Sequence, residues 1–162
     1  MDSEQLKALL TYDPGTGLFK WRSNRRGRGG IKAGDVAGTT HIKGYVQIKV
    51  LGALYLAHRL AWFYVHGEWP SAQIDHVNGC RNDNRLINLR LATAAQNGWN
   101  SKCHRDNRTG LKGVLVAGSK FEARIMRRGQ IIRIGRYNTP DDAHAAYVEV
   151  AARLDGEFAR FI

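Results

Sequence analysis

A polar segment between two short apolar segments is the feature that most limits how this chain can fold. Residues 77–87, VNGCRNDNRLI, are rich in Asn, Asp and Gly, which favour loops and turns. The segments QID before it and NLRLA after it have the length and composition of short strands. Thr93 and Gln96 then have the spacing of a capping box, which indicates a helix over residues 93–102. The sequence therefore predicts a strand, a loop, a second strand and a helix.

Three polar residues lie at the ends of these predicted strands or in the helix that follows them. His76 ends the first strand, Asn88 enters the second strand, and Asn97 lies in the helix. The spacing is twelve residues and then nine. A strand, a loop, a strand and a helix in this order bring the three side chains together.

These residue types suit the hydrolysis of a phosphodiester bond. A neutral imidazole such as that of His76 can accept a proton from water, because its ordinary pKa is about 6.5. Magnesium prefers oxygen ligands and keeps positions open for phosphate and water, which suits the Asp75 carboxylate and the Asn97 amide. Asn88 would hold the imidazole in the required tautomer. The alternative is that Asp75, Asn84 and Asn88 only form hydrogen bonds with loop backbone.

The formal net charge of +11 in 162 residues favours a polyanionic partner, and nucleic acid is the first candidate. Two segments hold much of this charge. Residues 20–32 contain six Lys or Arg and no acid, and residues 105–136 contain nine Lys or Arg and two acids. Arg81 and Arg85 flank the polar site, where contacts with phosphates and a role as solvated loop charges both stay open.

The apolar segments of this sequence are short. Near the middle, the longest apolar run is Ala61 to Val65, far below the roughly 20 residues that span a bilayer. The N-terminal sequence MDSEQLKALL lacks the pattern of a secretory signal. We therefore expect a cytoplasmic protein without membrane contact, and a monomer when it is free. Cys80 and Cys103 are expected to stay reduced, and we assign them no role.

Short strands and two helices are predicted before the polar site. Asp2 and Gln5 have a capping-box spacing for a short first helix, and GLFKW and YVQIKV have the patterns of strands. The glycines of RRGRGG, residues 25–30, predict a mobile basic loop. Residues 53–67, ALYLAHRLAWFYVHG, change to helical spacing and predict a second helix that ends at Gly67.

The segments LAHRLAWFYVHGEWP and IDHVNGCRNDNRLINLRLATAAQNGWN resemble the HNH homing-type endonucleases of phages. The resemblance covers about residues 45–100 and is to the variant whose third motif residue is Asn. It implies that His76 is the general base, that Asp75 and Asn97 bind a divalent metal, and that Asn88 orients the base. The implied metal is magnesium, with manganese as an alternative.

Two features of this resemblance leave alternatives open. Asn97 stands where the commonest HNH pattern has His, and no CxxC pairs flank the motif to bind a structural zinc, so the preferred metal is open. His58 and Arg59 match the H-R-L helix of the family. There, a structural role for a hydrogen-bonded His58 and a role as a ligand both stay possible.

Residues 109–161 resemble the DNA-binding domain of plant ethylene-response factors, which also occurs in phage nucleases. The shared features are K-G-V, A-R-I, I-G-x-Y, the helix start T-P-D-D-A and A-A-x-Y. The residues themselves predict three strands, GVLVA, FEARIMRR and IIRIGRY, followed by a helix from Thr139. The resemblance implies that the outer face of this sheet enters the major groove. Arg124, Arg128 and Arg133 are the candidates on that face, for contacts with bases or with phosphates.

The sequence thus predicts an α+β protein with an HNH strand-loop-strand-helix metal finger and a C-terminal three-stranded antiparallel sheet packed on one helix. The expected domains are residues 1–104, with the nuclease module, and residues 105–162, with the DNA-binding module. The expected function is metal-dependent hydrolysis of double-stranded DNA, by nicking or double-strand cutting. A phage protein of this kind would act in the cytoplasm of the host cell. The alternative is a DNA-binding regulator whose HNH region is inactive.

Overall fold

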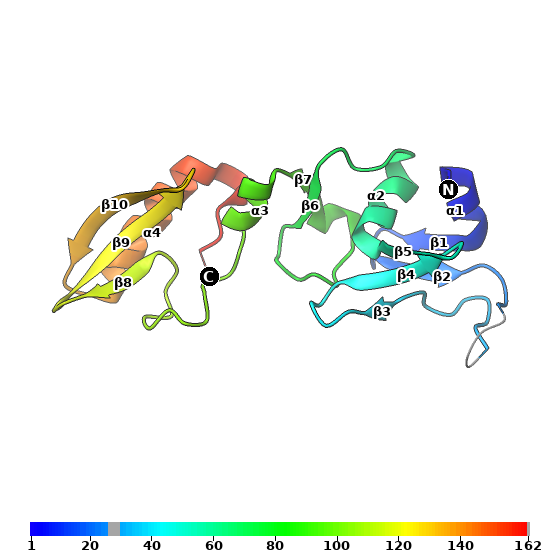
Figure 1. Cartoon of the computed structure of the whole chain (residues 1–162), viewed down its shortest axis with the longest axis horizontal. Helices are drawn as coiled ribbons and strands as arrows, with labels where there is room; N and C mark the ends of the chain where they lie inside the picture. The colour runs from blue at the N-terminus through cyan, green and yellow to red at the C-terminus, as the bar shows by residue number, and fades with distance from the viewer. Residues whose placement is uncertain (26–29, 162) are drawn as a thin grey trace. The chain divides into compact units, whose positions relative to one another are not determined.

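The structure is a computed structural model that describes residues 1–25 and 30–161. The predicted basic loop over residues 25–30 falls mostly on residues 26–29, which lie outside the described residues. The chain forms two compact units, Met1–Ala92 and Thr93–Ile162. Both units contain helices and strands (Figure 1), so the protein is α+β, as the sequence predicts. In the ranges described, no helix is long and apolar enough to cross a membrane.

Small antiparallel sheets and two α-helices make up the first unit. Strand β1 pairs with β2, β4 lies between β3 and β5, and β6 pairs with β7. In chain order the elements are α1 (Ser3–Leu9), β1 (Leu10–Asp13), β2 (Leu18–Trp21), β3 (Thr39–Thr40), β4 (Val46–Val50), β5 (Ala53–Leu56), α2 (Ala57–His66), β6 (Gln73–His76), the 3₁₀ helix η1 (Leu86–Asn88) and β7 (Leu89–Ala92). The blue-to-green part of Figure 1 shows these elements.

The core of the first unit forms where the opening helix and hairpin pack against α2. The capping box predicted at Asp2 and Gln5 is present, with both of its hydrogen bonds, and it starts α1. Leu6, Leu10 and Leu60 are completely buried in one apolar cluster. This cluster is the support on which the polar segment of residues 73–92 is built.

The helix predicted over residues 53–67 is wrong in its first part. Residues 53–56 form β5, and Tyr55 pairs with Ile48 of β4. Helix α2 begins only at Ala57 and ends at His66, and the following Gly67, with a φ of 76°, is its left-handed C-cap. The error arose because β4 supplies hydrogen-bond partners to these residues, and pairing between strands overrides a local helical pattern.

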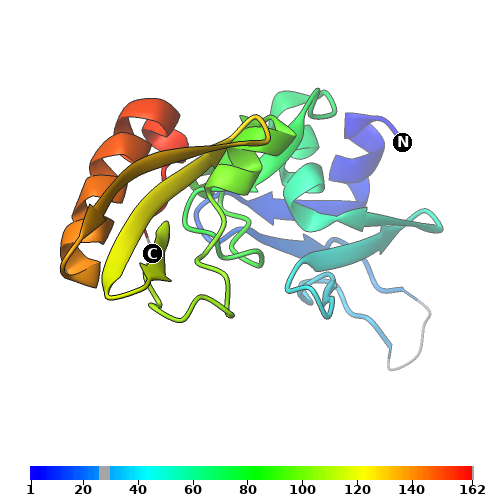
Figure 2. The same cartoon turned by 60° about the vertical axis from the view of Figure 1, so that its left-hand side comes forward.

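The second unit contains a three-stranded antiparallel sheet with α4 packed on it (Figure 2). The core there is formed by Val114, Ala123, Ile125 and Tyr147 with other apolar residues of α4. Thr139 caps α4 and Pro140 is its first residue, as predicted from the sequence. The elements are α3 (Ala94–Trp99), β8 (Val114–Ala117), β9 (Lys120–Arg127), β10 (Gln130–Tyr137), α4 (Pro140–Asp155) and the 3₁₀ helix η2 (Gly156–Phe158).

Helix α3 belongs to the second compact unit, although the expected domain boundary lies after it, between residues 104 and 105. The Lys112 ammonium donates hydrogen bonds to the backbone oxygens of Trp99, at 2.6 Å, and Ser101, at 2.7 Å. The Arg127 guanidinium lies over the Trp99 ring, 4.9 Å from its centre. A helix of six residues is marginal alone, so these contacts contribute to its position. The boundary near residue 104 stays a prediction about sequence modules.

Candidate active site

Asp75 and His76 lie at the end of β6 and are both buried, with exposed fractions of 4%. Strand β7 pairs with this part of β6, so that Asp75 is opposite Arg90 and His76 is opposite Leu89. Charged and titratable groups are seldom buried without a partner. One partner of Asp75 is Arg90, whose Nε and Nη2 atoms donate to Oδ2 at 2.9 Å and 2.8 Å.

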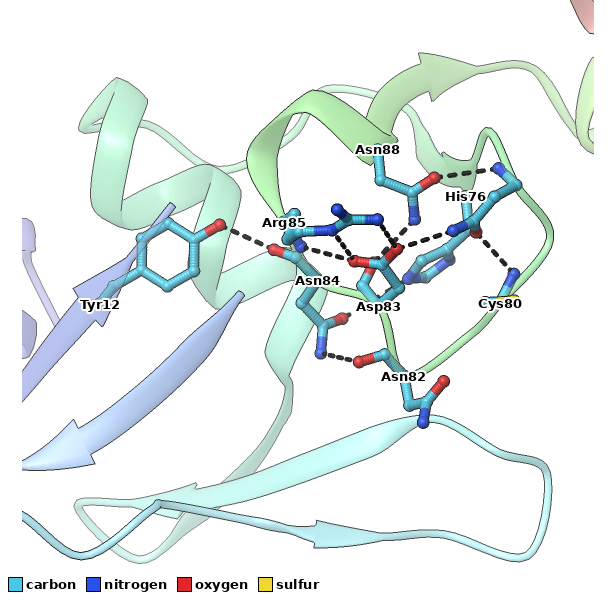
Figure 3. A network of polar contacts seen from close by, with 9 residues as sticks. Tyr12, His76, Cys80, Asn82, Asp83, Asn84, Arg85 and Asn88 are labelled. Atoms are coloured by element: carbon cyan, nitrogen blue, oxygen red, sulfur yellow. Dashed lines mark hydrogen bonds and ion pairs between the residues drawn. The ribbon is translucent and has the colours of Figure 1, made fainter. Parts of the chain in front are cut away.

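The loop after His76 is held together by its own polar side chains (Figure 3). The Asn88 amide accepts a hydrogen bond from the Asn78 backbone at 2.9 Å and donates one to the Asp83 backbone oxygen at 2.8 Å. The Asn78 side chain also donates to the Asp83 carboxylate at 2.7 Å. Asn88 therefore ties the two sides of the loop together, and its role in orienting the imidazole stays a proposal.

The Asn84 amide lies within hydrogen-bonding distance of the His76 imidazole (Figure 3), although Asn84 was not among the four predicted site residues. Its Oδ1 atom is 3.5 Å from Nε2 of His76, and its side chain is buried. The sequence signal was present, because Asn84 is one of several Asn residues in the loop, but nothing in the spacing singles it out. At this length the contact is at most a weak hydrogen bond.

Arg81 and Arg85, which flank the site in sequence, differ in their surroundings. Arg85 forms a bidentate ion pair with Asp83, from Nε to Oδ1 at 2.8 Å and from Nη2 to Oδ2 at 2.6 Å. This guanidinium is the main reason that the pKa of Asp83 is lowered to about 2. Arg81 instead donates from Nη1 to the Lys43 backbone oxygen at 3.0 Å. The charge of Arg85 is therefore partly neutralised within the loop.

The imidazole of His76 is kept in its neutral form by its surroundings. Burial lowers the pKa of His76, and the hydrogen bond to Asn84 and the charge of Asp75 oppose that shift. Burial is the main cause that lowers the pKa of the neighbouring His58 to about 3. The two ring centroids lie 5.0 Å apart. A neutral imidazole is the form that can accept a proton, so the electrostatics of the site suit a general base.

The hairpin of β1 and β2 contacts the loop that follows His76. The Tyr12 hydroxyl donates a hydrogen bond to the Asn84 backbone oxygen at 2.7 Å (Figure 3), and burial raises the pKa of Tyr12 to about 12. Gly17, with a φ of 74°, lies so close to the loop that a Cβ atom there would be 2.4 Å from the Arg85 backbone nitrogen. Glycine is therefore the residue that allows this approach.

We expect Gly17→Ala to destabilise the protein by about 3 kcal/mol, because it adds backbone strain to a collision with backbone atoms. Unfolding in urea measures the change. Gly67→Ala is the matched control, because Gly67 has a similar φ of 76° but a Cβ atom added there would meet no heavy atom within 4 Å. Equal losses of stability in the two variants would show that the contact with the loop contributes nothing.

The donor chemistry fits a hard divalent ion that takes part of its coordination from the substrate. The described part of the chain contains no group of three or more His, Cys, Asp or Glu that could hold a metal by themselves. Magnesium commonly uses one or two carboxylates together with phosphate oxygens and water. The Asp75 carboxylate belongs to the first unit and the amide of the half-buried Asn97 to α3 of the second unit, and their use as ligands of such an ion stays a proposal.

The three arginine candidates for DNA contact lie on and beside the sheet of the second unit. Arg124 of β9 is opposite Arg133 of β10, and Arg128 is exposed in the turn between these strands, with a φ of 51°. Glu122 lies 3.8 Å from the Arg133 guanidinium. Ala123 and Ile125, the neighbours of Arg124 along β9, are buried in the core. Arg124 thus lies between two core residues along β9.

Comparison with known proteins finds related sequences. Residues 55–99 match the HNH endonuclease family. Protein 3.8 of Escherichia phage T7 is 34% identical over 110 residues, which are 64% of this chain and 88% of that protein. The chain is therefore a relative of protein 3.8, and its residues 55–99 belong to the HNH endonuclease family. An uncharacterized HNH endonuclease of Acanthamoeba polyphaga mimivirus is 30% identical over 117 residues, which are 72% of this chain and 61% of that protein.

The HNH match runs from within β5 to the end of α3. It includes Asp75, His76, Asn88 and Asn97, and it ends before the three-stranded sheet of the second unit begins. No solved structure matches the chain significantly.

Proposed function

We propose that this HNH family member is a metal-dependent DNA endonuclease that uses His76 as its general base. The observation that carries the proposal is a buried, neutral imidazole next to a buried carboxylate at the end of β6, inside the segment that matches the family. Titratable groups with perturbed pKa values in such a setting are typical of catalytic sites.

In the proposed reaction His76 takes a proton from a water molecule as the oxygen of that water attacks phosphorus. The bond from phosphorus to the leaving ester oxygen breaks, and this oxygen is protonated by solvent. Asp75 and Asn97 would hold magnesium or manganese, which when bound neutralises charge on the phosphate and on the leaving oxygen. Asn84 and Asn88 keep the loop and the ring in place. One such site in a monomer would cut one strand.

A nicking assay on supercoiled plasmid tests this proposal directly. The wild-type protein should convert supercoiled plasmid to open circles with magnesium and not without it. A protein that binds DNA but leaves the plasmid intact at every metal concentration would support a regulator with an inactive HNH region instead.

The metal ligands have their own prediction. EDTA should stop cleavage, and Asp75→Asn and Asn97→Ala should each raise the magnesium concentration for half-maximal cleavage by about tenfold or more. Asn82→Ala is the matched control, because Asn82 lies in the same loop and the group that bonds Asn84 is its backbone oxygen, which the substitution keeps. Cleavage that continues unchanged in EDTA would remove the metal from the mechanism.

We further propose that the sheet of the second unit binds double-stranded DNA in the manner of ethylene-response-factor domains. The support is the excess of basic residues in residues 105–136 and the position of Arg124 and Arg133 as opposite residues on neighbouring strands. Two guanidinium groups at such a spacing suit successive phosphates or base edges.

A further inference from the structure

Tyr45 contacts two groups that belong to the proposed function. Its ring centroid lies 6.0 Å from that of His76, and the guanidinium carbon of Arg81 lies 5.0 Å from its ring centre. Tyr45 is half-buried and directly precedes β4, so it comes from a segment outside the family match. One aromatic ring thus lies against both the proposed base and a candidate phosphate contact.

The ring of His58 also packs against the imidazole of His76. The two rings meet edge to face, with an interplanar angle of 88° and centroids 5.0 Å apart, and Tyr45 is 5.3 Å from His58. Edge-to-face contact is a preferred arrangement of aromatic rings. His58 is 5% exposed, and its Nδ1 atom has no hydrogen-bond partner among the described residues. The His58 ring therefore acts as a packing surface, and with Tyr45 it limits rotation of His76.

Arg81 also contacts Tyr45. Its guanidinium lies over the Tyr45 ring and donates to the Lys43 backbone oxygen at 3.0 Å. Gly44, between Lys43 and Tyr45, lies beside the Arg81 side chain, since a Cβ atom there would be in ordinary contact with the Arg81 Cβ at 3.8 Å. No carboxylate pairs with Arg81 in residues 1–25 and 30–161, whereas Asp83 pairs with Arg85. Of the two loop arginines, Arg81 is therefore the one whose charge can pair with a phosphate.

We propose that Tyr45 is a positioning residue that holds the His76 imidazole for proton transfer and the Arg81 guanidinium for a phosphate of the bound DNA. The inference rests on the proposed function, since it assumes that His76 is the base. Proton transfer is sensitive to displacements of about 1 Å, which can lower a rate by about 100-fold. A ring that contacts both groups links substrate binding to the orientation of the base.

The test compares Tyr45→Leu with Tyr45→Phe, and measures kcat and KM separately on a short DNA duplex. Tyr45→Leu should lower kcat by about tenfold to 100-fold, because His76 loses one of its supports. It should also raise KM by about threefold, through the lost cation–π contact of Arg81. Tyr45→Phe keeps the ring and should stay within about twofold of wild type. Ile42→Ala, at a 95% exposed position of the same turn, is the control for the turn itself.

A double variant separates positioning from a loss of folding. If Tyr45 acts on KM through Arg81, then Tyr45→Leu combined with Arg81→Met should have the KM of Arg81→Met alone, because coupled residues are not additive. Independent increases that multiply would overturn the link. If Tyr45→Leu is unfolded by circular dichroism, Tyr45→Met, which fills the space without an aromatic ring, takes its place in both measurements.

The outcomes distinguish this inference from the proposed function. If His76→Ala abolishes cleavage while folded Tyr45→Leu has wild-type kcat and KM, Tyr45 is not a positioning residue, and the proposed function stands. If His76→Ala cleaves like wild type, the proposed function fails and the inference fails with it. Reduced kcat in Tyr45→Leu that Tyr45→Phe restores, together with a non-additive KM, supports the inference.

Discussion

His76→Ala is expected to lower the rate of DNA cleavage by about 100-fold to 10,000-fold while DNA affinity stays within about twofold of wild type. General acid–base catalysis is typically worth this factor, and it acts on the transition state rather than on the bound substrate. The buried position of His76 in the first unit supports such a division, because a residue that is 4% exposed offers little surface to DNA before the reaction. Single-turnover cleavage and a binding titration without metal measure the two quantities.

The controls address the burial of His76. Removing a buried ring leaves a cavity, so His76→Gln, which keeps much of the volume and a polar end, should show the same loss of cleavage with a smaller loss of stability. His104→Ala removes an exposed imidazole from the second unit and should cleave normally. A parallel decline of affinity and cleavage in both His76 variants would contradict the role of general base.

Replacing Arg124 and Arg133 of the sheet together with Arg128 of the turn is expected to give the largest change in DNA affinity. Each phosphate contact on duplex DNA contributes about 0.9 to the slope of log affinity against log salt concentration, so losing three such contacts should flatten that slope by up to about 3. If the guanidinium groups read bases instead, the slope will change less and the preference among DNA sequences will be lost. The variant carries Met at Arg124, Arg128 and Arg133.

A matched triple variant distinguishes the loss of this surface from the loss of net charge alone. Arg105, Arg108 and Arg153 are exposed in the same unit, and replacing them with Met removes the same charge elsewhere. Equal salt slopes for the two triple variants would show that the sheet face is not the DNA surface. Whole-chain variants are preferable to a chain cut after Cys103, because Lys112 and Arg127, which contact Trp99 of α3, would be lost with the sheet.

Local sequence patterns predicted those elements whose signals are local. The capping residues Asp2 and Thr139 start α1 and α4 as expected, because a cap and its partner lie within one helical turn. The capping box at Thr93 and Gln96 also forms, but α3 ends at Trp99, before the expected residue 102. Residues 53–56 were assigned to a helix because their partner strand, β4, is invisible to a local pattern.

The sequence by itself determined the α+β class, the family-like series of Asp75, His76, Asn88 and Asn97, and the basic character of the chain, since residue types and spacing carry these properties. Only the tertiary structure decided that Asn84 faces the imidazole, that Asp83 pairs with Arg85, and that Tyr45 lies between His76 and Arg81. The physical reason is that side-chain contacts depend on which loops the core brings together. Spacing along the chain does not encode a contact such as that between Tyr45 and His76, which forms because the fold of the first unit brings the two segments together.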